Sequence, residues 1–238
     1  LPDTYLEEVE KELQRKEADA FGGPDRAHES FTDVQKAINY AMTSFFTTGG
    51  IRGGKKKMDK FYPRSFNMGV RKSVYQALGG FSKMRFGEDI DFSIRIFKGG
   101  YDCRLFPEAW VWHKRRTDLK KFFKQVHNSG IARINLYKKY PESLKVVHLL
   151  PAVFTLGVVF LLLASLVCGW SLSLLLLFAL IICIDSTLQN KSLKIGLLSV
   201  VASFIQLTGY GTGFLIAWWK RCVCGKDEFS AFEKNFYK

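Results

Sequence analysis

Three long apolar stretches near the C-terminus constrain the fold of this chain more than any other feature. They are residues 147–169, 171–188 and 195–219. Each is close to the ~20 residues that an α-helix needs to cross a bilayer. The tight turn Gly169-Trp170-Ser171 predicts that the first two form a transmembrane hairpin, and Lys191 and Lys194 assign the outer ends of this hairpin to the cytoplasm by the positive-inside rule.

The third apolar stretch is polar and rich in glycine at its centre, where the sequence runs from Gln206 to Gly213. Backbone of this kind is tolerated at membrane depth only against protein or a water-filled cavity. The pattern therefore favours a broken or re-entrant segment that leaves the tail, residues 220–238, on the inner side. The alternative is a simple third span that packs on the hairpin through its small residues.

The region before the hairpin, residues 114–146, is strongly basic. It holds ten Lys and Arg residues against Asp118 and Glu142, and its apolar side chains share one helical face. This pattern predicts a basic amphipathic helix at the membrane interface, bound to anionic lipids. Nucleic acid is excluded as a partner because the charge directly precedes an apolar span and no recognition motif accompanies it.

Residues 1–113 alternate helical and strand patterns, which predicts an α/β fold. Leu6, Val9 and Leu13 indicate an outer helix, and Ser30 with Asp33 resembles a capping box before a second helix. The remaining predicted elements are strands at 18–21, 66–70, 101–106 and 109–113, with a short helix at 71–78. A basic, glycine-rich loop at 47–57 either meets an anion or is simply solvated.

The stretch from Phe86 to Phe92 places three acids, Glu88, Asp89 and Asp91, at the start of a predicted helix that ends at Gly99-Gly100. Asp91 can pair with Arg95 one turn later, a local interaction worth about 0.5 kcal/mol. Glu88 and Asp89 follow a glycine, so at least one carboxylate points into the preceding loop. The spacing leaves open a catalytic acid or base and a capped helix start.

His113 ends the last predicted strand, beside Lys114-Arg115-Arg116. A single histidine in this position is either a structural residue or a ligand, and the sequence leaves both open. The five cysteines are odd in number, and none has a spacing to histidine that is typical of a metal site.

Several of these motifs occur in an order that resembles a known family. The motifs are Asn67-Met68-Gly69-Val70-Arg71-Lys72, Gly79-Gly80-Phe81, Gly87-Glu88-Asp89-x-Asp91-Phe92 and a strand that ends at His113. Their order and spacing resemble the second half of a family 2 glycosyltransferase domain with the GT-A fold, of the bacterial membrane-attached type. The resemblance extends from Leu1 to about Tyr140, and the tail from Lys226 to Tyr237 is also similar.

The resemblance implies roles for individual residues. It makes Asp89 the general base, with Glu88 beside it, and lines the sugar and acceptor cleft with Asn67 and with the pair Gly79-Gly80. His113 matches a histidine that completes the metal site in some members. Arg133 matches the arginine of a Gln-x-x-Arg-Trp motif as a phosphate contact; no Trp follows it, which favours a non-processive enzyme.

In such enzymes the first half of the domain binds the nucleotide diphosphate through Mg²⁺ or Mn²⁺ on an Asp-x-Asp motif. This chain does not include that first half or the Asp-x-Asp motif that ends it, and it begins without Met, so we expect these ligands to precede Leu1 in a longer protein. The 238 residues alone are expected to bind membranes without transferring sugar.

The sequence thus predicts four regions: a partial GT-A domain on the acceptor side (1–113), an interfacial region (114–146), a transmembrane region (147–219) and a tail (220–238). The expected function is an inverting transferase for polysaccharide of the cell envelope. It would move a sugar from a nucleotide-sugar donor to a lipid-linked or surface-glycan acceptor on the cytoplasmic face of the inner membrane. The alternative is a non-catalytic membrane scaffold or lipid-binding protein that retains the fold.

Overall fold

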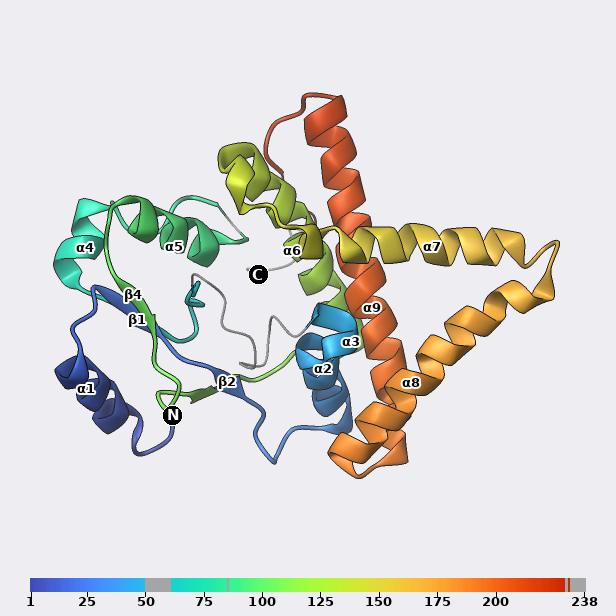
Figure 1. The fold of residues 1–238 in the computed structure, drawn as a ribbon, viewed down its shortest axis with the longest axis horizontal. Coiled ribbons are helices and arrows are strands. Elements are labelled where there is room, and N and C mark those ends of the chain that lie inside the picture. Colours follow the sequence, from blue (N-terminus) through green and yellow to red (C-terminus); the bar gives the residue numbers. More distant parts are fainter. Residues whose placement is uncertain (50–60, 85, 230, 232–238) are drawn as a thin grey trace. The chain divides into compact units, whose positions relative to one another are not determined.

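The computed structural model describes residues 1–49, 61–84, 86–229 and 231 (Figure 1). Most of the basic loop predicted at 47–57 and the end of the tail lie outside these residues. The chain divides into two compact units. The first comprises Leu1–Ser30 and Gly53–Lys114, and the second comprises Phe31–Arg52 and Arg115–Lys238.

The first unit is built on small sheets with helices around them, as the alternating pattern predicts. Strand β1 (Ala20–Gly22) lies between β3 (Met68–Val70), which is antiparallel to it, and β4 (Cys103–Leu105), which is parallel. Strands β2 (Asp25–Arg26) and β5 (Val111–Trp112) form a parallel pair. The helices are α1 (Tyr5–Arg15), α4 (Lys72–Ala77) and α5 (Glu88–Lys98).

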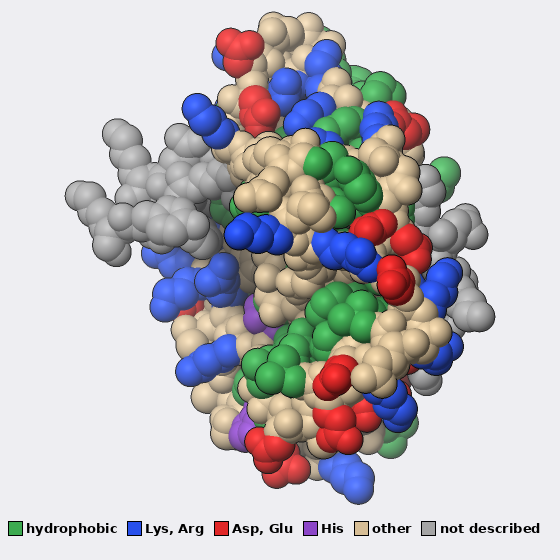
Figure 2. All heavy atoms as spheres, turned by 90° about the vertical axis from the view of Figure 1, so that its left-hand side faces the viewer, with side chains coloured by type: hydrophobic (Ala, Val, Ile, Leu, Met, Phe, Trp, Pro, Cys, Tyr) green, Lys and Arg blue, Asp and Glu red, His purple; other side chains and the backbone are tan. Residues whose placement is uncertain are grey.

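Helix α5 has the predicted bounds and forms the centre of this unit, because its Phe92 and Ile96 are fully buried against Ala20 of β1. Helix α1 is the outer helix that the sequence predicts, but its apolar face is different. Leu6 is 74% exposed, and Tyr5 takes its place beside Val9 and Leu13 in the cluster around Phe106. Acidic and basic side chains are spread over the face shown in Figure 2.

The second unit is helical in the part of the chain that the structure describes. Its α-helices are α2 (Asp33–Thr43), α3 (Phe45–Thr48), α6 (Leu119–Lys139), α7 (Leu150–Ala164), α8 (Ser173–Asn190) and α9 (Leu193–Trp218). Thr32, and not Ser30, caps α2: its hydroxyl accepts from the Gln35 amide at 3.3 Å, and the Gln35 side chain accepts from the Thr32 amide at 3.1 Å. Thr32 and Gln35 have the spacing of a capping box, so the predicted box is displaced by two residues.

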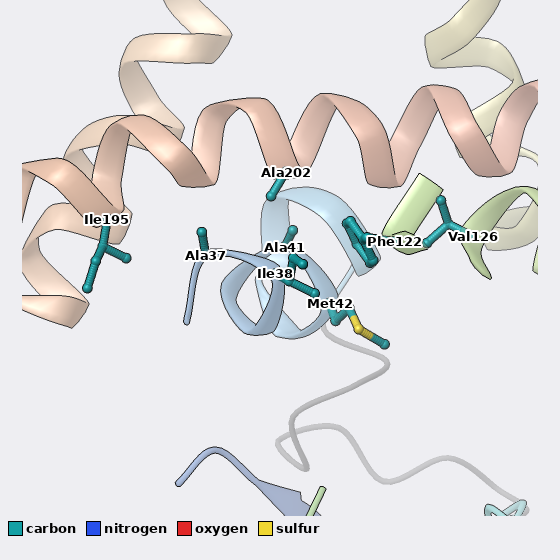
Figure 3. Close-up of a cluster of buried hydrophobic side chains, with 8 residues drawn as sticks. All are labelled: Ala37, Ile38, Ala41, Met42, Phe122, Val126, Ile195 and Ala202. Atoms are coloured by element: carbon teal, nitrogen blue, oxygen red, sulfur yellow. The ribbon is translucent and has the colours of Figure 1, made fainter. Parts of the chain in front are cut away.

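Helix α9 is the element on which α2, α6, α7 and α8 all pack. Figure 3 shows one of its clusters, in which apolar side chains of α2 and α6 meet α9. The buried members are Ala37, Ile38, Ala41, Met42, Phe122, Val126, Ile195 and Ala202. The apolar residues that recur along α2 with a 3.6-residue period thus pack against α6 and α9, which lie far from α2 in the sequence.

The prediction that the third apolar stretch is broken is wrong. Helix α9 is continuous over 26 residues, through the glycine-rich centre. A Cβ atom on Gly213 would lie 2.0 Å from the His127 carbonyl oxygen of α6, and one on Gly211 would lie 2.3 Å from the Pro151 carbonyl oxygen of α7. These glycines therefore bring helix backbones together, and the hydrogen bonds of α9 stay intact.

Among the described residues, three helical segments are long and apolar enough to cross a membrane, at 146–164, 169–190 and 193–223. The first two form the predicted hairpin, and most of their apolar side chains point away from the protein. Val159, Phe160 and Leu163 on α7 and Leu174 and Leu176 on α8 are each more than half exposed. Side chains of this kind on a hairpin suit contact with lipid.

We expect Gly213→Ala to destabilise the second unit. The added methyl group meets backbone, which cannot rotate away, so the free energy of unfolding should fall by about 1–3 kcal/mol, as in other overpacked sites. The matched control is Gly157→Ala on α7, where nothing lies within 4 Å of the new Cβ. Thermal unfolding in detergent should show a loss for the first variant and none for the second; equal midpoints would contradict this account of the glycines.

Candidate active site

The start of α5 is a turn that only glycine adopts without strain. Gly87 has φ 84° and ψ 13°, in the left-handed region, and its carbonyl oxygen accepts from the Asp91 amide at 2.9 Å. The next two residues, Glu88 and Asp89, therefore begin the helix with their carboxylates at its positive end. This geometry agrees with the sequence prediction for the stretch.

Asp89 is nearly buried, with 9% of its surface exposed. One carboxylate oxygen, Oδ1, accepts from the Ile90 amide at 2.8 Å. The other, Oδ2, lies 3.5 Å from Nη1 of Arg64. The side chain is thus fixed by one backbone donor and one cation, and a fixed carboxylate is what a general base requires.

Glu88 lies beside it and is partly exposed. Partial burial raises the pKa of the Glu88 carboxyl, and the negative charge of Asp89 raises it further. Two adjacent carboxyl groups thus have different surroundings: Asp89 is nearly buried next to a guanidinium, and Glu88 is half-buried with a raised pKa. Divergent environments of this kind are typical of acid and base pairs in enzymes.

Asp91 is more than the local partner of Arg95 that the sequence predicts. It is fully buried, and its Oδ2 accepts from Arg95 Nε at 3.0 Å. The other guanidinium nitrogens of Arg95 donate to the carbonyl oxygens of Leu78 at 2.7 Å and Gly80 at 2.6 Å. The expectation of about 0.5 kcal/mol for an exposed helix pair is therefore too low, because this pair is buried and ties α5 to the glycine turn.

That turn consists of Gly79 and Gly80, both in the left-handed region with φ of 70° and 67°. A Cβ on Gly80 would lie 2.7 Å from the Tyr75 ring, so a side chain at this position would have to displace that ring. At Gly79 the described residues leave open space within 4 Å. The structure thus connects the turn to the acidic helix through Arg95, and its contact with a substrate stays a prediction.

Asn67 has an internal role in the structure. It is 3% exposed; its amide nitrogen donates to the Ala109 carbonyl oxygen at 2.8 Å, and its amide oxygen accepts from the Tyr5 hydroxyl at 2.7 Å. The side chain joins α1 to the segment before β5. Its predicted contact with sugar stays a prediction, for a residue whose amide is already bonded within the protein.

His113 follows β5, and its ring stacks on Phe66 with 4.1 Å between ring centres. Its Nδ1 lies 3.4 Å from Oδ2 of Asp25. A divalent ion needs more donors than these two, and no group of three or more metal-binding side chains occurs in the described ranges. The described residues therefore do not form a metal site by themselves, and we derive no step through Mg²⁺ or Mn²⁺.

Arg133 belongs to the second unit, on α6, whereas the other predicted site residues belong to the first. Sequence reasoning missed two residues of the site: Arg64 as the partner of Asp89, and the contact of Arg95 with the glycine turn. Between Arg52 and Lys72 the sequence contains many cations, including Arg64, and a single acid, Asp59. This charge pattern could have indicated that Arg64 has a carboxylate partner elsewhere in the chain.

The chain belongs to the family described as glycosyl transferase family group 2, whose model matches residues 4–188. It is similar to the probable glycosyltransferase YdaM of Bacillus subtilis (strain 168), with 32% identity over 59 residues. That match covers 25% of this chain and 14% of YdaM, so the chain aligns with a small part of that relative. No solved structure matches the chain.

We expect Asp91→Asn to lower the free energy of unfolding by about 3 kcal/mol, because it removes a fully buried carboxylate and leaves the partly buried Arg95 guanidinium without its countercharge. The control is Asp102→Asn, whose carboxylate makes an exposed pair with Lys16 at 3.8 Å and should cost less than about 1 kcal/mol. Tryptophan fluorescence during denaturant unfolding measures both. Similar losses in the two variants would mean that the Asp91–Arg95 pair contributes no more than a surface pair.

Glu88→Gln should stabilise the protein in a pH-dependent way. Because the pKa of Glu88 is raised in the folded state, the folded protein keeps a proton that the unfolded chain has released, and stability is lost as the pH rises above the unfolded pKa. The variant lacks this cost. Its melting temperature should exceed that of the wild type at about pH 8, and the difference should shrink towards about pH 4. An advantage that does not change with pH would point to another cause.

Proposed function

We propose that the protein to which this chain belongs is an inverting glycosyltransferase in which Asp89 is the general base. The observation that carries the proposal is the carboxylate of Asp89, fixed at the N-terminal end of a buried helix between the Ile90 amide and Arg64. Membership of a glycosyltransferase family supports it.

In the proposed reaction Asp89 takes the proton of the acceptor hydroxyl. The acceptor oxygen then bonds to the anomeric carbon of the donor sugar from the side opposite to the leaving group, and the bond from that carbon to the nucleoside diphosphate breaks. One carboxylate is enough for this inverting step. Arg64 holds the base in place, and Arg95 holds the glycine turn against the same helix.

The proposed substrates are a nucleotide-sugar donor and a lipid-linked or surface-glycan acceptor at the cytoplasmic face of the membrane. The apolar hairpin, nearly all of which lies within the family match, supports an acceptor that is held at the bilayer. Lys120 and Lys121 are exposed at the start of α6, which supports contact with anionic lipids. A non-catalytic membrane scaffold or lipid-binding protein with the same fold is the second candidate, which the exposed apolar side chains of the hairpin support equally well.

Asp89→Asn in the full-length protein should reduce transfer by about two to four orders of magnitude, the usual contribution of a general base. Asn keeps an oxygen for the Ile90 amide, so the helix start should persist while the basic oxygen is lost. Release of nucleoside diphosphate from a panel of nucleotide sugars, with membranes as the source of acceptor, measures the rate, and donor binding should change little.

The matched control is Asp102→Asn, an acid-to-amide change at an exposed pair, which should keep the wild-type rate. If Asp89→Asn folds normally and transfers sugar at the same rate as this control, Asp89 is not the base. If the unchanged full-length protein turns over no donor in the panel, the scaffold gains support.

A further inference from the structure

Helix α9 crosses the bases of the hairpin instead of running beside it. Figure 1 shows α7 leaving α9 sideways and α8 returning to it. Gly211 of α9 contacts Pro151 and Thr155 in the first turns of α7, while Ser199 Oγ lies 2.7 Å from Ser186 Oγ near the end of α8. These two contacts on α9 are 12 residues apart, which is about 18 Å along a helix. Between them, the Phe204 ring of α9 contacts both Phe154 of α7 and Phe178 of α8.

The other side of α9 is covered by a helix that is unsuited to hydrocarbon. Helix α6 follows α9 from Val126 beside Gly209, past Gly130 beside the Tyr210 carbonyl, to Asn135, whose Oδ1 accepts from Arg221 Nη1 at 2.7 Å. It carries six cations and no acid between Leu119 and Lys139. The two helices therefore lie at the same depth over most of the length of α6.

Both ends of α9 have polar partners from helices outside the hairpin. At its start, Lys194 pairs with Asp33 of α2 at 2.8 Å, and just beyond its end Arg221 bonds to Asn135 of α6. If α9 crossed the bilayer, α6 would be drawn into the hydrocarbon together with its lysines. Charged residues are rarely tolerated there without partners.

We propose that α9 lies along the membrane surface, in the plane of the bilayer, so that of the three candidate spans among the described residues α7 and α8 cross the membrane and α9 does not. Lipid contacts the face of α9 that the other helices leave exposed. Leu193, Leu197 and Val201 follow one another at four-residue spacing and are 62%, 57% and 47% exposed. Trp219 comes five full turns after Val201, so it lies on the same side of the helix near the C-terminal end, where it is 58% exposed.

In this arrangement the apolar composition of α9 is explained by packing inside the protein and not by a passage through the membrane. In its most apolar 18-residue window 44% is buried inside the protein, against 11% for each helix of the hairpin, and its mean hydropathy is 1.4 against 2.5 and 2.3. Much of its hydrophobic surface is therefore used for packing on α2, α6 and the hairpin. Length and composition alone do not separate such a helix from a membrane span.

Two native cysteines report which arrangement holds. Cys168 lies exposed at the tip of the hairpin, and Cys224 lies exposed just after α9. If α9 is in the plane, the tip and the tail are on opposite sides of the membrane. If α9 is a third span, they are on the same side. The comparison does not depend on what the protein catalyses or on which side faces the cytoplasm.

The experiment uses the full chain in cell membranes, in two variants that keep either Cys168 or Cys224 and carry serine at the other four cysteine positions. A membrane-impermeant maleimide is added to right-side-out vesicles and, separately, to inverted vesicles, and labelling is expressed relative to that in detergent. Lys191→Cys in the background without native cysteines marks the side of the turn between α8 and α9.

We expect each vesicle type to label only one of the two cysteines, with Cys224 and position 191 labelled together and Cys168 in the opposite preparation. At least a fivefold preference should be seen in each. Labelling of Cys168 and Cys224 in the same preparation, with position 191 in the other, would overturn the proposal and establish α9 as a span. Leu197→Glu is also added to the Cys224 variant. If α9 lies in the plane with Leu197 at the membrane surface, Cys224 should be labelled in the same vesicle type with and without this change.

Discussion

Helices α6 and α7 approach the backbone of α9 closely at its glycines, which have no side chains. Gly209, Gly211 and Gly213 are spaced two residues apart, so successive glycines turn towards α6 and α7 by about 200°. This close approach fixes the position of α6 and of the hairpin base on a single helix. Helix α2 packs on a further side of α9 through Ala37, Ile38 and Ala41. The second unit thus depends on contacts that any side chain at these positions would prevent.

A second constraint organises the first unit. The Arg95 guanidinium satisfies three acceptors, the Asp91 carboxylate and the carbonyl oxygens of Leu78 and Gly80, and so joins α5 to the turn after α4. Asp89 stands two residues before Asp91 on the same helix. The candidate base is therefore attached to a buried helix held by its own ion pair, and not to a mobile loop, which is the kind of support that a preorganised site needs.

The family match over residues 4–188 includes parts of both units. Residues 31–52 precede most of the acidic site in the sequence but pack with the C-terminal helices. The chain therefore leaves the first unit, contributes this segment to the second unit and returns to the first. The sequence predicts a boundary between a soluble first part and a membrane second part of the chain. In the structure, α2 of the first part packs through its apolar face on α6 and α9 of the second part.

The sequence alone determined the features that local chemistry controls. The bounds of α5 follow from its periodicity, from Gly87 before it and from Gly99-Gly100 after it, and the hairpin follows from hydropathy and the turn at Trp170. Only the tertiary structure decided which faces are used: Tyr5 and not Leu6 is packed inward, Asp91 is buried, and the glycines of α9 join helices and do not break one. A glycine in the sequence shows that a side chain is absent at that position. Only the tertiary structure shows whether a ligand, water or another helix occupies the space.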